Sequence, residues 1–341
     1  MNPRLTARLP FRIGIIILVL YACSVSCNNK PEIRSIGSIE KIDPSLDNIL
    51  STDSKIEIIA EGFDWSEGPL WIEDKKMLLF SDIPPNTIYK WTEENGKEVY
   101  LTPSGYTSTE KRGGEVGANG LALNQKGELV LCQHGDRRIA IMNAGLDAPM
   151  PKYSSISDNY NGKKFNSPND VAIRSNGELF FTDPPYGLEK NMDDPKKEIP
   201  FQGVYKVSVD GKTHLLTDSI TRPNGIGFLP GDSVLLVANS DPEKAIWYAF
   251  NISGDSLTNS RIFYDATAAG KKDKGSPDGF KVNKKGIVFA SGPGGVWVFD
   301  SNAKVLGKIK IPESVSNVAL TADEKTLFIT ADMYVLRVKL L

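Results

Sequence analysis

The segment "SPNDVAIRSNGELFFTD", residues 167–183, decides the fold because its pattern recurs along the chain. It opens on Ser, Pro, Asn and Asp, which are turn formers, and continues with a short stretch of alternating apolar residues. A turn containing Asn and Gly then leads to a second apolar stretch that ends in Thr and Asp. The segment is therefore predicted to form two short strands joined by a tight turn.

Five further copies of this pattern define an internal repeat. They read "SEGPLWIEDKKMLLFSD" from residue 66, "GANGLALNQKGELVLCQ" from 117, "RPNGIGFLPGDSVLLVAN" from 222, "SPDGFKVNKKGIVFASG" from 276 and "VSNVALTADEKTLFITAD" from 315. The polar residues that precede the first strands lie at intervals of 52, 50, 55, 54 and 39 residues and are Glu67, Asn119, Asn169, Asn224, Asp278 and Asn317. Such a period, with several short strands per unit, is typical of a β-propeller, whereas the period-two alternation excludes helical repeats. An all-β, six-bladed β-propeller with four-stranded blades is predicted.

The strands of one whole blade can be assigned in the third repeat. From the channel outward they are residues 170–175, 178–183, 203–209 and 213–218. The sixth repeat is short, because the chain ends after "YVLRVKLL" (334–341), which supplies only its third strand. A fourth strand is available at the other end of the chain, in "KIEIIAEG" (55–62). Pairing of these two segments would close the ring without a long unpaired edge, and the propeller is predicted to span residues 55–341.

The first 27 residues differ from the rest of the chain. Three arginines precede the apolar run "IGIIILVLYA", which is short for a membrane span, and this order is typical of a secretory signal. "LYAC", ending at Cys23, resembles the lipobox of bacterial lipoproteins, and "SVSC", ending at Cys27, is a competing cleavage site. A lipid on either cysteine would hold an exported periplasmic or cell-surface protein to a membrane, with plain secretion as the alternative. Residues 28–54 are mostly polar and are predicted to be a tether.

Composition and missing motifs exclude several classes of function. The net charge of −2 and the lack of Lys/Arg blocks argue against a nucleic-acid partner. Cys132 lies in an apolar strand pattern, which predicts a buried and inert thiol. With only His134 and His214 in the chain, a zinc site of the Cys/His type is not expected. The sequence also lacks a G-x-S-x-G elbow, a P-loop and a dinucleotide-binding fingerprint.

The repeated polar residues predict a cation site. Equivalent positions of successive blades lie around one axis, so five oxygen-bearing side chains should meet at the mouth of the channel: Glu67, Asn119, Asn169, Asn224 and Asp278. Carboxylate and amide oxygens suit a hard divalent cation, with calcium expected first and Mg²⁺, Mn²⁺ or Zn²⁺ as alternatives. The competing interpretation is that these residues only hydrogen-bond to neighbouring blades. Glu67 favours the cation, because Glu is a poor turn former.

The motifs "SEGPLW", "LCQHGDRRI", "SPNDV", "FTDPPYG", "RPNGIGF" and "SPDGF" resemble the SMP-30/gluconolactonase/luciferin-regenerating-enzyme family, from about residue 56 to the C-terminus. The resemblance implies a six-bladed propeller with one divalent cation at the channel mouth, and many members hydrolyse sugar lactones. It implies an acid–base role for Asp170 and cation ligands at Glu67, Asn169, Asn224 and Asp278. Gln133 stands where the family often has Glu in "CEHG", which leaves that acid without a counterpart.

The predicted function is accordingly the cation-dependent opening of sugar lactones, a carboxylic ester hydrolysis, by a monomer. Asp170, or His134 as the second candidate, would carry the proton, and the substrate would contact Asn119, Asn169 and Tyr186. The structural alternatives are a turn cap for Asp170 and a satisfied rim histidine for His134. Two other functions stay open: a related propeller enzyme acting on another ester or sugar-derived substrate, and a non-catalytic calcium-binding propeller that binds a partner.

Overall fold

Antiparallel four-stranded sheets follow one another along the chain in the computed structural model, which describes Met1 and residues 34–341. Six of the sheets formed by the described residues are the blades of a propeller, and their innermost strands contact one another in a closed ring. This confirms the predicted all-β, six-bladed fold.

The first three blades are each built in chain order from the channel outward. Blade one comprises β3 (Ser66–Ile72), β4 (Met77–Asp82), β5 (Thr87–Thr92) and β6 (Gly96–Leu101). Blade two comprises β7 (Ala118–Leu123), β8 (Leu129–Gln133), β9 (Arg138–Met142) and β10 (Tyr153–Ser157). A small hairpin of β11 (Asn159–Tyr160) and β12 (Lys163–Lys164) precedes blade three. Blade three comprises β13 (Val171–Ile173), β14 (Leu179–Asp183), β15 (Gly203–Val207) and β16 (Thr213–Thr217), which are the four strands assigned from the sequence.

Blades four and five follow the same plan. Blade four comprises β17 (Pro223–Phe228), β18 (Val234–Asn239), β19 (Ile246–Ser253) and β20 (Ser256–Asp265). Blade five comprises β21 (Phe280–Val282), β22 (Val288–Gly292), β23 (Gly295–Phe299) and β24 (Val305–Lys310). The helical segments of the described residues are short: η1 (Pro44–Asn48), η2 (Glu73–Lys75), η3 (Asn191–Asp193) and α1 (Thr267–Gly270).

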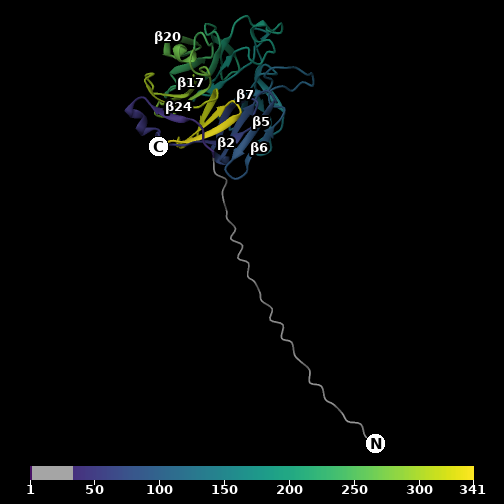
Figure 1. Ribbon diagram of the computed structural model, residues 1–341. Helices are drawn as coiled ribbons and strands as arrows, with labels where there is room; N and C mark the ends of the chain where they lie inside the picture. The colour runs from purple at the N-terminus through teal and green to yellow at the C-terminus, as the bar shows by residue number, and fades with distance from the viewer. Residues whose placement is uncertain (2–33) are drawn as a thin grey trace. The chain divides into compact units, whose positions relative to one another are not determined.

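Blade six combines both ends of the propeller sequence, as predicted. It comprises β25 (Val315–Leu320), β26 (Thr326–Ala331), β27 (Tyr334–Lys339) and, outermost, β2 (Ile56–Glu61). β2 pairs antiparallel with β27, with Ile56 opposite Val338 and Glu61 opposite Tyr334. Figure 1 shows β2 beside the yellow C-terminal strands.

Apolar side chains fill the spaces between neighbouring blades. In β4, Leu79 packs toward blade two, whereas Leu78 and Phe80 pack toward blade six. Successive side chains of a strand point to opposite faces, and both faces of each blade are covered, so β4 is a continuous apolar run rather than an alternating one. Cys132 is 0% exposed and belongs to the layer between blades two and three, which confirms the predicted buried thiol.

The predicted polar tether is wrong for its second half. β1 (Ser38–Lys41) pairs with β24 as a fifth strand at the outer edge of blade five, and Ser38 lies opposite Lys310. The 3₁₀-helix η1 follows, with the Asp43 side chain accepting a hydrogen bond from the Ser45 amide at its start. Leu46 and Leu50 are both 0% exposed and join the layer between blades five and six. The segment contains few apolar residues, but these two leucines are buried in the same layer of the core.

The predicted signal segment, including Cys23 and Cys27, lies outside the described residues. Among the residues that are described, the helices are all too short or too polar to span a membrane.

Candidate active site

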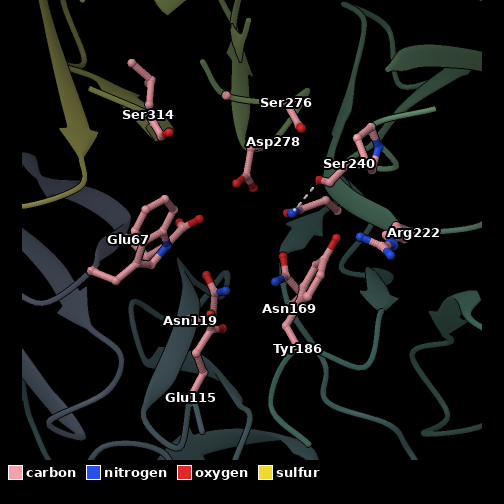
Figure 2. A pocket seen from close by; sticks show the side chains of 15 residues that line it. Glu67, Glu115, Asn119, Asn169, Tyr186, Arg222, Ser240, Ser276, Asp278 and Ser314 are labelled. Carbon is pink, nitrogen blue, oxygen red and sulfur yellow. Dashed lines mark hydrogen bonds between the residues drawn. The ribbon is translucent and has the colours of Figure 1, made fainter. Parts of the chain in front are cut away.

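The residues at the start of the innermost strands, or directly before them, meet in a pocket of about 340 Å³ at one end of the channel. Five of the six repeated polar residues line it: Glu67, Asn119, Asn169, Asn224 and Asp278. Figure 2 shows the Glu67, Asn119, Asn169 and Asp278 side chains turned toward a common space. Tyr186, from the long segment between β14 and β15, also lines the pocket. The sixth repeated residue, Asn317, instead donates a hydrogen bond to Glu67 Oε2 at 3.3 Å.

The residue after each pocket residue explains how the blades come so close together. In four blades it is glycine, and a Cβ on Gly68 would lie 2.0 Å from the Asn119 carbonyl oxygen of the next blade. Blade three carries Asp170 at this position instead, and a Cβ on Gly120 would lie 2.7 Å from Asp170 Oδ1. The Asp170 carboxylate therefore occupies space near the channel axis that the glycines of other blades leave open.

Hydroxyl groups at the ends of the second strands fix the backbone of the pocket residues. Ser81 donates a hydrogen bond to the Asn119 carbonyl at 2.9 Å, and Thr182 donates one to the Asn224 carbonyl at 2.7 Å. Ser316, on the innermost strand β25, donates one to the carbonyl of Ser66, the neighbour of Glu67, at 2.6 Å and so joins blade six to blade one. Each bond crosses from one blade to the next, so the pocket residues are held by the ring as a whole.

Several buried oxygens in the pocket lack a hydrogen-bond partner among the described residues. They are Asn119 Oδ1, Asn169 Oδ1 and Asp278 Oδ1. A buried polar atom without a partner is costly, and oxygens of this kind are what a hard cation requires. Asn224 adds another amide oxygen. Its Nδ2 donates to Ser240 Oγ at 2.8 Å, so its oxygen is left for a ligand; the dashed line in Figure 2 ends at the labelled Ser240. The donor set fits a divalent cation.

The two carboxylates of the predicted ligand set, Glu67 and Asp278, are the strongest electrostatic feature of the site. Burial raises the pKa of Glu67 to about 8, and the negative charge of Asp170 contributes to this shift. Burial, together with Glu67 and Asp170, raises the pKa of Asp278 well above its usual value. A bound cation would offset this repulsion. Within the described part of the chain, however, no three or more His, Cys, Asp or Glu side chains gather as a metal cluster, so amide oxygens would have to complete the shell.

The two predicted proton carriers lie behind the pocket wall. Asp170 is 2% exposed; its Oδ1 accepts a hydrogen bond from the Val171 amide, and its Oδ2 has no partner among the described residues. His134 is 0% exposed, and its Nε2 lies 3.4 Å from Asn119 Nδ2. Burial lowers the pKa of His134 to about 3, so this ring is neutral near pH 7. These features favour a positioning role for His134 over its predicted role as proton carrier.

Glu115 and Arg222 also line the pocket and were not predicted as site residues. Glu115 lies on the segment that leads into β7, and Arg222 directly precedes β17. In the "SPND" copy of the repeat, a serine stands at the position that corresponds to Arg222. Glu115 lies outside the repeat. The repeat therefore carried no signal for either residue.

Comparisons with known proteins identify the family of the chain. Residues 65–332 match the model of a protein family described as the SMP-30/Gluconolactonase/LRE-like region. The chain is 37% identical to a gluconolactonase of Zymomonas mobilis over 317 residues, which cover 89% of this chain and 86% of the relative. It is 23% identical to the pentonolactonase XacC of Haloferax volcanii over 272 residues, covering 77% and 80% of the two chains.

A solved structure shows the same likeness. XC5397 of Xanthomonas campestris, described as a gluconolactonase important in glucose secondary metabolic pathways, superposes with a TM-score of 0.77 at 27% identity. The match covers 92% of this chain and 100% of that protein.

Proposed function

This chain belongs to the SMP-30/gluconolactonase/LRE-like family, and on that basis we propose that it is a divalent-cation-dependent hydrolase that opens sugar lactones at the mouth of the propeller channel. Its gluconolactonase and pentonolactonase relatives place it among the lactone hydrolases, a class of carboxylic ester hydrolase. A sugar lactone is the substrate, and a divalent cation at the channel mouth is needed for its hydrolysis.

One observation supports the proposal above the others: partnerless carbonyl and carboxylate oxygens from different blades face one pocket. Glu67, Asn169, Asn224 and Asp278 would hold the cation, with water completing its shell. When bound, a divalent cation polarises a lactone carbonyl and stabilises negative charge on its oxygen. The pocket volume falls in the range of small-molecule sites, so a monosaccharide lactone can be enclosed.

The remaining pocket residues would bind and orient the lactone. Asn119 presents an amide oxygen without a partner among the described residues, which can accept a hydrogen bond from a sugar hydroxyl. Burial raises the pKa of Tyr186 far above its usual value, so its phenol stays protonated and can donate a hydrogen bond. The guanidinium of Arg222, opposite Glu67 in Figure 2, adds further hydrogen-bond donors to the pocket.

A panel of five- and six-membered lactones tests the proposal. Acid release is followed by pH indicator, first with the protein as purified, then after chelation, and then after Ca²⁺, Mg²⁺, Mn²⁺ or Zn²⁺ is returned. We expect turnover of at least one sugar lactone, its loss on chelation and its recovery with one cation. Full turnover after complete chelation would refute the cation dependence. Tight cation binding without turnover of any lactone would instead identify a non-catalytic binding propeller.

A further inference from the structure

A carboxylic acid outside the predicted ligand set faces the pocket from the β6–β7 segment. The Glu115 side chain keeps 37% of its surface exposed, and Figure 2 shows it directly below Asn119 in the pocket wall. Asp170 and His134, by contrast, are almost completely buried. A lactone in the pocket can therefore touch the Glu115 carboxyl, whereas the two predicted proton carriers lie behind the residues that it would meet.

Neighbouring groups hold Glu115 in place without neutralising it. The Arg112 guanidinium donates hydrogen bonds to the carbonyls of Gly135 and Gly187. The Gly113 amide donates to Glu189 Oε1 at 2.6 Å, which ties the Glu115 segment to the segment that carries Tyr186. The positive charge nearest in sequence is thus engaged elsewhere.

His134 supports Glu115 from behind. Its Nδ1 lies 3.6 Å from Glu115 Oε2, and its Nε2 faces the amide nitrogen of Asn119. Because Asn119 Nδ2 can only donate, a neutral His134 accepts at Nε2 and carries its proton on Nδ1, toward Glu115. The same contact turns Asn119 Oδ1 away from His134, so the histidine orients Asn119 and lies beside Glu115 without a hydrogen bond to its carboxyl group.

From this geometry we propose that Glu115 is the catalytic acid–base residue of lactone opening, an inference that rests on the proposed function. Glu115 as a carboxylate takes a proton from water while the water oxygen bonds to the lactone carbonyl carbon. The bond between that carbon and the ring oxygen then breaks, and its electron pair stays on the ring oxygen. Glu115 returns the proton to this oxygen, so that one lactone and one water give one hydroxy acid.

The electrostatics of the pocket agree with a group that both gains and loses a proton. Burial raises the pKa of Glu115 to about 7. The titratable and charged groups that share the pocket with it are Glu67, Asp278, Tyr186 and Arg222. His134 lies beside it, while Arg112 and Glu189 bond to backbone groups of the adjoining segments. An acid–base catalyst works best when its pKa lies near the working pH, because both protonation states are then populated.

The test compares Glu115→Gln with the wild-type protein and with Glu110→Gln, a matched control on the exposed part of the same segment. We expect Glu115→Gln to lower kcat by about 10²- to 10⁴-fold, the range for general acid–base catalysis, while bound metal and Tm stay unchanged. The pH profile of kcat should lose one limb. Glu110→Gln should behave as wild type in all four measurements.

A leaving-group comparison separates proton delivery from a general loss of activity. Dihydrocoumarin, an aryl lactone, releases a phenol that needs a proton far less than the alcohol released by a sugar lactone. Glu115→Gln should therefore impair dihydrocoumarin opening at least tenfold less than sugar-lactone opening. Wild-type kcat in Glu115→Gln, equal losses on both lactones, or lost metal would each overturn the assignment. Absence of lactone turnover in the wild type would instead refute the proposed function.

Discussion

Among the pocket residues, Glu67 best tests whether the site binds a cation, because a cation ligand needs its charge whereas a turn residue does not. Glu67→Gln preserves side-chain size and the capacity to accept hydrogen bonds from Gly68 and Asn317, but it removes one negative charge. We expect at least a tenfold loss of cation affinity, measured by calorimetric titration of the chelated protein, because charge count sets the affinity of oxygen sites. The matched control is Glu94→Gln, in the exposed β5–β6 turn. Unchanged cation affinity in Glu67→Gln would remove Glu67 from the ligand set.

A substitution at Asp170 separates the effect of its charge on cation binding from a role in proton transfer. Its carboxylate lies beside the channel axis, where it raises the pKa values of Glu67 and Asp278. We expect Asp170→Asn to weaken cation binding, because a nearby negative charge is lost, and to keep kcat within about tenfold of wild type at saturating cation. A hundredfold loss of kcat with the cation fully bound would instead support the role that the sequence predicts for Asp170.

Repetition explains which site residues the sequence could reveal. Glu67, Asn169, Asn224 and Asp278 occupy one position of a repeat, so the topology alone places them together. Glu115 belongs to a single connecting segment, and its place in the pocket depends on how that segment folds back. The Ser81 and Thr182 hydroxyls did carry a signal, since a small polar residue recurs near the end of the second strands. Their role became clear only when neighbouring blades were seen in contact.

At the scale of elements, a substitution in the β1–η1 segment tests whether this part of the predicted tether stabilises the fold. Leu46 is 0% exposed between blades five and six, so Leu46→Ala should lower the free energy of unfolding by about 2–5 kcal/mol, the usual cost of a buried Leu→Ala change. Ile42→Ala is the control, because Ile42 is 51% exposed and should change stability little. Urea denaturation of both variants provides the measurement. Equal stability of Leu46→Ala and wild type would mean that the segment does not contribute to the fold in solution.

An ion cluster between blades three and four predicts an acid-sensitive contact. Lys206, on β15, lies 2.8 Å from Glu178 Oε1 and also bonds Asp255 in the β19–β20 turn. Burial alone would raise the pKa of Glu178, but hydrogen bonds from Lys206, Asn176 and Arg174 lower it from 4.5 to about 2. A lowered folded-state pKa stabilises the fold above the unfolded value of 4.5, and this contribution is lost as the pH falls toward 2.

Glu178→Gln should therefore destabilise the protein at pH 6 to 7 and have progressively less effect as the pH falls below 4.5. Tm measured from pH 7 to pH 3 would follow this convergence of variant and wild type. The exposed Glu128→Gln, in the equivalent turn of blade two, provides the comparison. A constant difference in Tm across the whole range would show that Glu178 acts through packing and not through its charge.

At the scale of the whole molecule, we propose that the chain is exported and held to a membrane by a lipid on Cys23 or Cys27, as the lipobox-like sequences indicate. Changing both cysteines to serine should move the protein from the membrane fraction to the soluble fraction, because no other acyl-bearing residue is predicted. The single variants would show which cysteine is used. A double variant that stays in the membrane fraction would contradict the lipid anchor.

The overall architecture was more predictable than its boundaries. Six copies of a strand pair define the blade number, and the spare strands at the two ends indicated the β2–β27 closure. Residues 38–50 were misassigned because β1 depends on an edge of blade five that is more than 260 residues away, with Ser38 opposite Lys310. No local pattern in so polar a segment reveals a partner at that distance.

The closure of blade six also sets an order of events during synthesis. β2 is synthesised early, but its partner strand β27 follows only after the other five blades have been made. Glu67 can contact Asn317 only once β25 has been made, so the pocket is completed only when the ring closes. A chain that lacked β27 would leave β2 as an unpaired edge strand, so the completeness of the pocket reports whether the ring has closed.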